Sequence, residues 1–400
     1  MIGLEGHRAD VIDYHDCIKL IEDHVKRYTV EELETMNSAR KQAGVAVLKW
    51  EAFKSTKHGK RMLEEPPWSV ESIETTSPPA TFLPRLVAGS EPQVLAGIKV
   101  LELCRIIAGP AIGRGLAEYG ADVLKITSPS LSDVPFFQVD GNLGKHTADL
   151  DLHNPADRKT FESLLLTADV ILDGFRPGSL ERLGYGPYQV LDLIKERKRG
   201  IVYVGEDCFG HYGEWASRPG WQQIADCVTG IAWTHGRYMG LDEPVVPPFP
   251  MSDYGTGCMG TIAALTGLYK RAKFGGSYHG KCSIVQYDIY LTQLGLYDDA
   301  VLEKLRQTHD EDFFKLRHHD SVNEVGRRAL KSMRRAHPEL FEQRFFHESW
   351  SRGFNTVLRY VSPVAKIEGT RNGFSRSSRP NGFDEATWVD WEVDEAMVKA

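Results

Sequence analysis

Residues 100–126 read VLELCRIIAGPAIGRGLAEYGADVLKI. The apolar run at 98–103 predicts a central strand, and the pair Gly109-Pro110 leads into a helix that Gly120 closes. A second apolar run at 121–126 predicts the next strand. Two parallel strands need a crossover connection, usually a helix, so this order predicts one unit of a parallel sheet.

The alternation continues along the chain. Further helices are predicted at 155–167, near 187–197 and at 258–272, and further strands at 168–175 and 200–206. We therefore expect an α/β fold, with a Rossmann-like parallel sheet flanked by helices and a smaller additional unit.

Four consecutive segments are expected. They are a small α/β segment at 1–62, a proline-rich linker at 63–95, the Rossmann-like domain at 96–290, and a helical and turn-rich region at 291–400. In the first segment, helices are predicted at 13–25 and after Thr29, whose spacing to Glu32 is that of a capping box. The run AGVAVLKW at 43–50 predicts a buried strand, and the residues near the C-terminal end predict a surface tail.

Composition excludes several classes of protein. The formal net charge of −7 argues against general nucleic-acid binding, which needs an excess of Lys and Arg. The six cysteines form no C-x-x-C pair, so neither a zinc site nor a disulfide framework is expected. We find no signal-peptide pattern and no run of about 18 apolar residues. A soluble cytoplasmic protein is predicted, with mitochondria and peroxisomes left open.

The first strand-to-helix turn, CRIIAGPAIG, limits the ligand class. It contains neither the G-x-G-x-x-G pattern of dinucleotide-binding folds nor the lysine of a P-loop. In an open α/β sheet the ligand crevice still lies at the carboxyl ends of the strands, where helix N-termini can bind phosphate groups.

Five blocks in one order resemble the family III CoA-transferases, the group of formyl-CoA transferase, carnitine CoA-transferase and α-methylacyl-CoA racemase. The resemblance covers roughly residues 95–290, and residues 1–62 resemble the late part of a family subunit. The blocks are VLELCRIIAGPAIGRGLAEYGADVLKI, GNLGKHTADLDLHNP, ADVILDGFRPGSLERLGYGP, GHYGEWASRPGWQQIADCVTG and FPMSDYGTGCMGTIAALTGLYKRAKFGGSYHGK.

The resemblance implies a nucleophile and a reaction. The family's catalytic aspartate corresponds to Asp253 in the stretch SDYGTG at 252–257. A carboxylate can attack a thioester carbonyl, expel CoA thiolate and hold the acyl group as a mixed anhydride. Small glycines beside Asp253 would let the thioester approach and would leave backbone amides free for an oxyanion.

The resemblance also implies coenzyme A, bound as a substrate thioester, with a carboxylic acid as the second substrate. A homodimer is expected, and no metal, nucleic acid or membrane partner. The residues expected to bind CoA are Ile106, Ile107, Ala108, Lys145, Phe175, Arg182 and Trp221.

Departures from the family pattern keep two alternatives open. Thr127-Ser128 stands where the family has Glu and a basic residue, Gly174 stands where it often has Asn, and no glycine-rich lid loop is visible. A non-catalytic CoA-binding homologue is therefore one alternative. The other is a racemase at the carbon next to the thioester, but Trp221 stands where a racemase has its histidine, so His211 or His235 would have to replace that base.

Overall fold

The computed structural model describes residues 1–80, 91–389 and 391. The chain forms two compact units, each assembled from separate stretches of sequence. Unit 1 comprises Met1–Glu64, Tyr212–Phe249 and Asp288–His337, and unit 2 comprises Glu65–His211, Pro250–Tyr287 and Pro338–Ala400. The chain thus leaves and re-enters each unit, which differs from the four consecutive segments predicted from the sequence.

Unit 2 is built on a seven-stranded sheet in the order β1-β7-β6-β5-β2-β3-β4. Strands β2 to β7 pair in parallel, and β1 pairs antiparallel with β7 at one border. The predicted Rossmann-like sheet is therefore confirmed. The strands are β1 (Trp68–Glu74), β2 (Lys99–Leu103), β3 (Asp122–Thr127), β4 (His146–Asp149), β5 (Val170–Asp173), β6 (Val202–Asp207) and β7 (Ser277–Ser283).

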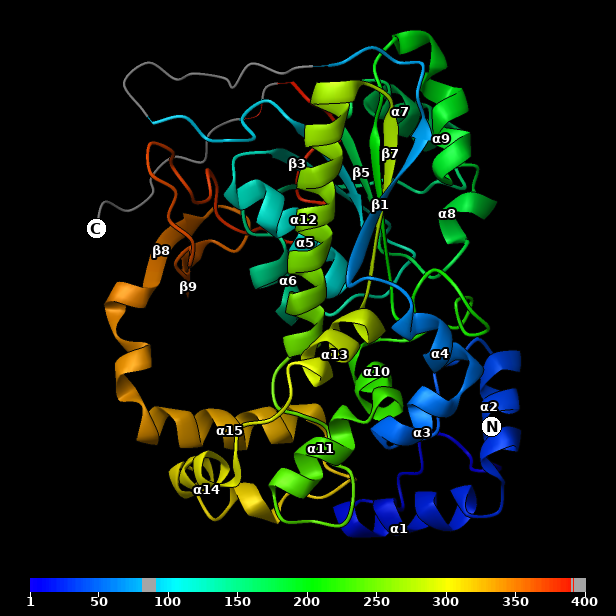
Figure 1. The fold of residues 1–400 in the computed structure, drawn as a ribbon, viewed down its shortest axis with the longest axis vertical. Helices are drawn as coiled ribbons and strands as arrows, with labels where there is room; N and C mark the ends of the chain where they lie inside the picture. Colours follow the sequence, from blue (N-terminus) through cyan, green and yellow to red (C-terminus); the bar gives the residue numbers. More distant parts are fainter. Residues whose placement is uncertain (81–90, 390, 392–400) are drawn as a thin grey trace. The chain divides into compact units, whose positions relative to one another are not determined.

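Helices cover both faces of this sheet (Figure 1). On one face Val100 and Val123 pack with α5 (Ala108–Glu118) and α12 (Met251–Phe274). On the other face their neighbours Leu101 and Leu124 pack with α7 to α9. Burial on both faces explains why the strands read as unbroken apolar runs. The remaining helices near the sheet are α6 (Pro135–Gly141), α7 (Pro155–Leu165), α8 (Ser179–Arg182), α9 (Pro187–Ile194), η1 (Lys195–Arg197) and α13 (Ile284–Gln293).

Unit 1 is helical in the described residues. The predicted capping box is present, because Thr29 and Glu32 exchange side-chain and backbone hydrogen bonds at the start of α2. A small apolar core includes Met239, Phe313 and Val325. The helices are α1 (Tyr14–Val25), α2 (Val30–Ala39), α3 (Trp50–Ser55), α4 (Lys57–Leu63), α10 (Gln222–Thr229), α11 (Ile231–Tyr238), α14 (Asp299–Thr308), η2 (Phe313–Lys315) and α15 (Val322–Ala336).

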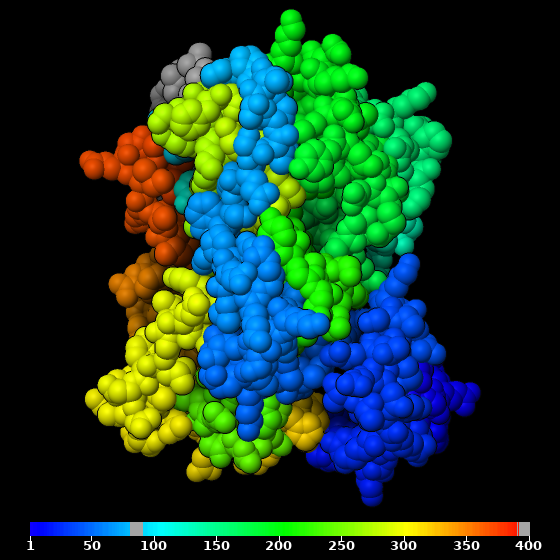
Figure 2. Space-filling view, turned by 45° about the vertical axis from the view of Figure 1, so that its right-hand side comes forward, coloured from blue at the N-terminus to red at the C-terminus, as the bar shows by residue number. Residues whose placement is uncertain are grey.

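Two predictions for the residues that precede β2 are wrong. Residues 43–49 form no strand, and Trp50 begins α3; the Leu48 amide donates to the Cys227 carbonyl instead of to a neighbouring strand. The proline-rich stretch predicted as a linker contains β1, since its prolines flank that strand at 66–67 and 78–79. Residues 81–90 of that stretch lie outside the described residues. Figure 2 shows the chain segment that includes β1, in light blue, at the surface beside α12, in yellow-green.

The predicted surface tail is also wrong in part. After the 3-10 turns η3 (Pro338–Phe341) and η4 (Gln343–Phe345), a hairpin of β8 (Phe346–Ser351) and β9 (Thr356–Val361) leads into residues 374–389, which we call the C-terminal segment. Within it Arg376 and Arg379 are buried. The Asp384 amide donates to the Thr147 carbonyl of β4 at 2.7 Å, so this segment lies along the β4 border of the sheet.

Candidate active site

The strand order reverses between β2 and β5, whose last residues Leu103 and Asp173 lie side by side. In open α/β sheets ligands bind in the crevice at such a switch point. The following loops approach Cys104 closely. A Cβ atom added to Gly109 or Gly174 would lie 2.7 or 2.8 Å from the Cys104 Sγ. Cys104 therefore requires glycine at 174, which explains the departure noted in the sequence.

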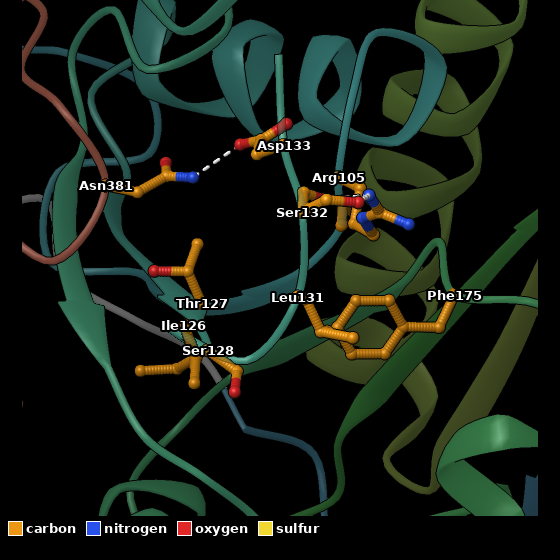
Figure 3. A pocket seen from close by; sticks show the side chains of 10 residues that line it. Arg105, Ile126, Thr127, Ser128, Leu131, Ser132, Asp133, Phe175 and Asn381 are labelled. Atoms are coloured by element: carbon orange, nitrogen blue, oxygen red, sulfur yellow. Dashed lines mark hydrogen bonds between the residues drawn. The ribbon is translucent and has the colours of Figure 1, made fainter. Parts of the chain in front are cut away.

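A pocket opens beside this switch point, in the loops that follow β2, β3 and β5 (Figure 3). Its free space is about 270 Å³, part of which is continuous with bulk solvent, so the pocket is a shallow and open one. We call it the switch-point pocket. Its wall combines the Arg105 guanidinium, the Phe175 ring, several hydroxyl groups and the amide of Asn381 from the C-terminal segment. These groups suit one aromatic ring with attached phosphate better than a whole coenzyme.

A second, smaller pocket lies on the other side of the β2–α5 turn. Ile106 and Ile107 line it together with Tyr254, the residue after Asp253. The Tyr254 hydroxyl donates to the Asp140 carboxylate at 2.5 Å. The predicted Ile106-Ile107 turn and the first turn of α12 are thus brought together at one concave surface.

Asp253 lies in the first turn of α12 and is 7% exposed. Helix N-termini favour negative charge, but burial opposes it and raises the pKa of Asp253 to about 7. The helix predicted at 258–272 starts earlier, at Met251, so Asp253 lies within its first turn and not before it. At neutral pH a large fraction of Asp253 is therefore protonated.

Three more carboxyl groups end the neighbouring strands β5 and β6, and the sequence analysis did not identify them. Burial raises the pKa of Asp173 to about 6, although the Tyr203 hydroxyl donates to it at 2.7 Å. Burial and the charges of Asp207, Asp253 and Asp173 raise the pKa of Glu206 well above its usual range. The Glu206 Oε2 lies 3.4–3.5 Å from where Cβ atoms on Gly174 and Gly109 would lie. The carboxyl end of the sheet thus gathers acidic groups whose pKa values burial raises.

The remaining predicted CoA-binding residues are dispersed. Ala108 is buried at the start of α5, and Arg182 is exposed at the end of α8, where it donates to the Ser179 hydroxyl at 3.0 Å. Trp221 belongs to unit 1, is 49% exposed and precedes α10. Their role in binding remains a prediction.

Lys145 is fully buried, so this structure gives a phosphate no access to it. Its Nζ lies 2.6 Å from Glu102 Oε2 and donates to the Pro110 carbonyl at 2.7 Å. Burial lowers the pKa of Lys145 to about 8, while Glu102 opposes the shift. This lysine fixes the first turn of α5 through its hydrogen bond to the Pro110 carbonyl.

The glycines after Asp253 serve packing; their expected role in admitting the thioester stays a prediction. A Cβ atom on Gly255 would lie 2.0 Å from the Tyr287 ring, and one on Gly257 would lie 2.4 Å from the Ala111 Cβ. Gly257 thus allows α12 to cross α5 closely. This contact fixes the N-terminal part of α12, which carries Asp253, beside α5.

Both histidines considered as a replacement base are partly exposed and lie against backbone carbonyl groups. The His211 Nε2 lies 3.1 Å from the Gly205 carbonyl oxygen and its Nδ1 lies 3.5 Å from Asp207. His235 belongs to unit 1 and its Nδ1 lies 3.1 Å from the Val245 carbonyl oxygen. Among the described residues no three His, Cys, Asp or Glu side chains are grouped as a metal site, and no helix is long and apolar enough to cross a membrane.

Comparison with known proteins gives a family match. A model described as CoA-transferase family III matches residues 95–320. The chain is 37% identical over 375 residues to acetyl-coenzyme A transferase nodX of Hypoxylon pulicicidum, covering 92% of this chain and 63% of that protein. It is 39% identical over 299 residues to an acyl-CoA transferase of Gibberella moniliformis, covering 73% of this chain and 52% of that protein. The chain thus spans less than two thirds of these relatives.

The fold also matches a solved structure. The crystal structure of Rv3272 from Mycobacterium tuberculosis, in its orthorhombic form, superposes with a TM-score of 0.54 at 20% identity, covering 73% of this chain and 98% of that one. At this identity the likeness concerns the fold alone.

Proposed function

Because the chain belongs to CoA-transferase family III, we propose that it moves CoA from an acyl-CoA thioester to a carboxylic acid, with Asp253 as the nucleophile. The observation that carries this proposal is the shared pocket of the Ile106-Ile107 turn and Tyr254, since it sets the residue next to Asp253 at the crevice of the sheet. The acyl-CoA transferases among its relatives support the same reaction class.

The reaction balances without a proton. The Asp253 carboxylate attacks the thioester carbonyl, the carbon–sulfur bond breaks, and an aspartyl-acyl anhydride and CoA thiolate result. The thiolate then attacks the aspartyl carbonyl, so CoA becomes linked to Asp253 and the first acid leaves. A second carboxylate reverses both steps and departs as the new thioester.

Burial gives Asp253 two properties that this chemistry needs. A carboxylate in a site of low water content is a stronger nucleophile than a solvated one, and the anhydride is protected from hydrolysis. The cost is the raised pKa, which leaves only part of the population ionised at neutral pH. Of the neighbouring acids, Asp173 with a pKa of about 6 stays mostly ionised at neutral pH, whereas burial favours the protonated form of Glu206.

The proposal is tested by trapping the acyl group. Acyl-CoA and hydroxylamine are expected to give an acyl hydroxamate with the wild-type protein, and the intact chain is expected to carry an adduct on Asp253 by mass spectrometry. Asp253→Asn keeps the shape but removes the nucleophile, so both signals are expected to disappear. Asp192→Asn, on the exposed side of α9, is the control and retains them. An undiminished hydroxamate yield from Asp253→Asn rejects the proposal.

A further inference from the structure

The loop at 128–134, between β3 and α6, forms one wall of the switch-point pocket. Ser128, Leu131, Ser132 and Asp133 all line the pocket from this loop. The loop contains a proline and three serines and is largely exposed, so its own packing does little to fix its position. Whatever fixes it determines the shape of the pocket.

Three side chains from outside the loop hold it: Arg105 at Ser132, and Gln138 and Asn381 at Asp133, where Gln138 Nε2 donates to the carboxylate at 3.1 Å. The Arg105 guanidinium donates to the Ser132 carbonyl from the β2–α5 turn. Asn381 Nδ2 donates to the Asp133 carboxylate from the C-terminal segment, as the dashed line in Figure 3 shows. Each of these hydrogen bonds has one charged partner, the Arg105 guanidinium or the Asp133 carboxylate, and such a bond is roughly twice as strong as a neutral one.

Asn381 is itself fixed by a buried polar chain. Its Oδ1 accepts from Asn142 Nδ2 at 3.0 Å, and its backbone amide donates to Gln138 Oε1 at 3.1 Å. Asn142 is fully buried and accepts in turn from the Lys125 ammonium at 2.9 Å. The amide of Asn381 is therefore oriented before any ligand arrives, with its oxygen toward the sheet and its nitrogen toward the loop.

We infer that Asn381 is a positioning residue for the nucleotide end of CoA, because it holds the 128–134 loop in the place where the loop completes the switch-point pocket. This inference rests on the proposed function. The aromatic face of Phe175 suits an adenine ring, and Arg105 beside the serine hydroxyls suits a phosphate group. Asn381 acts through the loop and leaves the reacting thioester, near Asp253, untouched.

The test replaces only the donor that faces the loop. Asn381→Asp keeps an oxygen for Asn142 but sets a second carboxylate against Asp133, so the loop is expected to move away. The KM for acyl-CoA is expected to rise about tenfold, the effect of losing one hydrogen bond to a charged group. The KM for the matching acyl-pantetheine thioester, which has no nucleotide, is expected to stay unchanged, and so is kcat with either donor.

The reciprocal variant separates positioning from misfolding. Asn381→Asp combined with Asp133→Asn exchanges donor and acceptor, so the KM for acyl-CoA is expected to return to within about threefold of wild type. Asn372→Asp is the control, since this side chain donates to the Ala365 carbonyl outside the pocket. If Asn381→Asp does not fold, Asp133→Ala breaks the same contact from the loop and is expected to give the same selective rise.

Two results would overturn the inference: an unchanged KM for acyl-CoA, or an equal rise with both donors. If the wild-type protein transfers no CoA to any acid, the proposed function fails. The role of Asn381 in binding the nucleotide end of CoA can then still be tested by calorimetry. A loss of CoA affinity in Asn381→Asp with no loss of pantetheine affinity would then support the inference. An equal loss, or none, would refute it.

Discussion

Replacing Asp253 by asparagine is expected to abolish transfer and also to stabilise the protein at alkaline pH. The pKa of Asp253 rises from 3.8 to about 7 on folding because the carboxyl group is buried. The folded state therefore binds a proton more tightly than the unfolded state, and the free energy of unfolding falls as the pH rises from about 4 to about 7. A difference of about 3 in pKa corresponds to about 4 kcal/mol.

Asparagine cannot ionise, so the free energy of unfolding of Asp253→Asn increases relative to that of wild type as the pH rises across this range. Between pH 5 and pH 9 only the part of the range from 5 to about 7 contributes, which is about 3 kcal/mol. The amide itself adds a constant cost of about 1–3 kcal/mol if it lacks a partner, and this cost cancels between the two pH values.

Urea unfolding of both proteins at pH 5 and pH 9 measures the effect. The difference in unfolding free energy between Asp253→Asn and wild type is expected to increase by about 3 kcal/mol from the lower to the higher pH. Asp192→Asn, with its exposed side chain, is expected to give the same difference at both values. A pH-independent difference for Asp253→Asn would show that the carboxyl group titrates normally, and the argument from burial would be refuted.

Three further predictions follow from the same structure. The kcat/KM for transfer is expected to rise with pH through about 7, since only ionised Asp253 attacks, and a profile that is flat between pH 5 and 8 would contradict this. Lys145→Met is expected to cost about 3–5 kcal/mol in urea unfolding because it leaves Glu102 buried without its cation, and Glu102→Leu in the same chain should recover most of that loss. Gly257→Ala forces α12 away from α5 and is expected to cost about 1–3 kcal/mol and to reduce transfer. The helical control Gly326→Ala, whose added methyl group meets nothing closer than 4.0 Å, should be neutral or stabilising by up to about 1 kcal/mol. Equal losses at 257 and 326 would refute the packing argument.

The sequence predicts the sheet well where strands are buried on both faces. The strands β2, β3, β5 and β6 are apolar runs between turn residues, so their pattern alone identifies them. Strand β4 was missed because its four residues, HTAD, include only one apolar side chain. Its polar groups are satisfied by the C-terminal segment, which accepts the Thr147 hydroxyl at the Pro380 carbonyl.

The opposite error at 43–50 has a related cause. The run is apolar and rich in valine, yet it finds no strand to pair with in unit 1, and its apolar side chains are only half-buried in a helical surrounding. Local pattern predicts that a segment is buried, whereas pairing depends on partners elsewhere in the chain.

The candidate site shows the same contrast between residues that a local pattern identifies and residues that only the fold brings together. Phe175 was predicted and lines the switch-point pocket, because it follows a recognisable strand at the carboxyl edge of the sheet. Asp133 and Asn381 were not predicted, since 248 residues separate them and neither lies in a recognised motif. Glu206 carried a usable signal, because an acidic residue ending a buried strand faces the same crevice.

Both borders of the sheet are completed late in synthesis. Strand β1 is made first but pairs only with β7, roughly 200 residues later. Its exposed Glu71 and the register shift after Ser72 discourage pairing with other chains. Thr147 of β4 is bonded by Asp384, which is synthesised 237 residues later. At about 5–20 residues per second, the ribosome leaves that border bare for roughly 10–50 s. Both borders of the sheet therefore stay unpaired through much of synthesis, and the β4 border closes last.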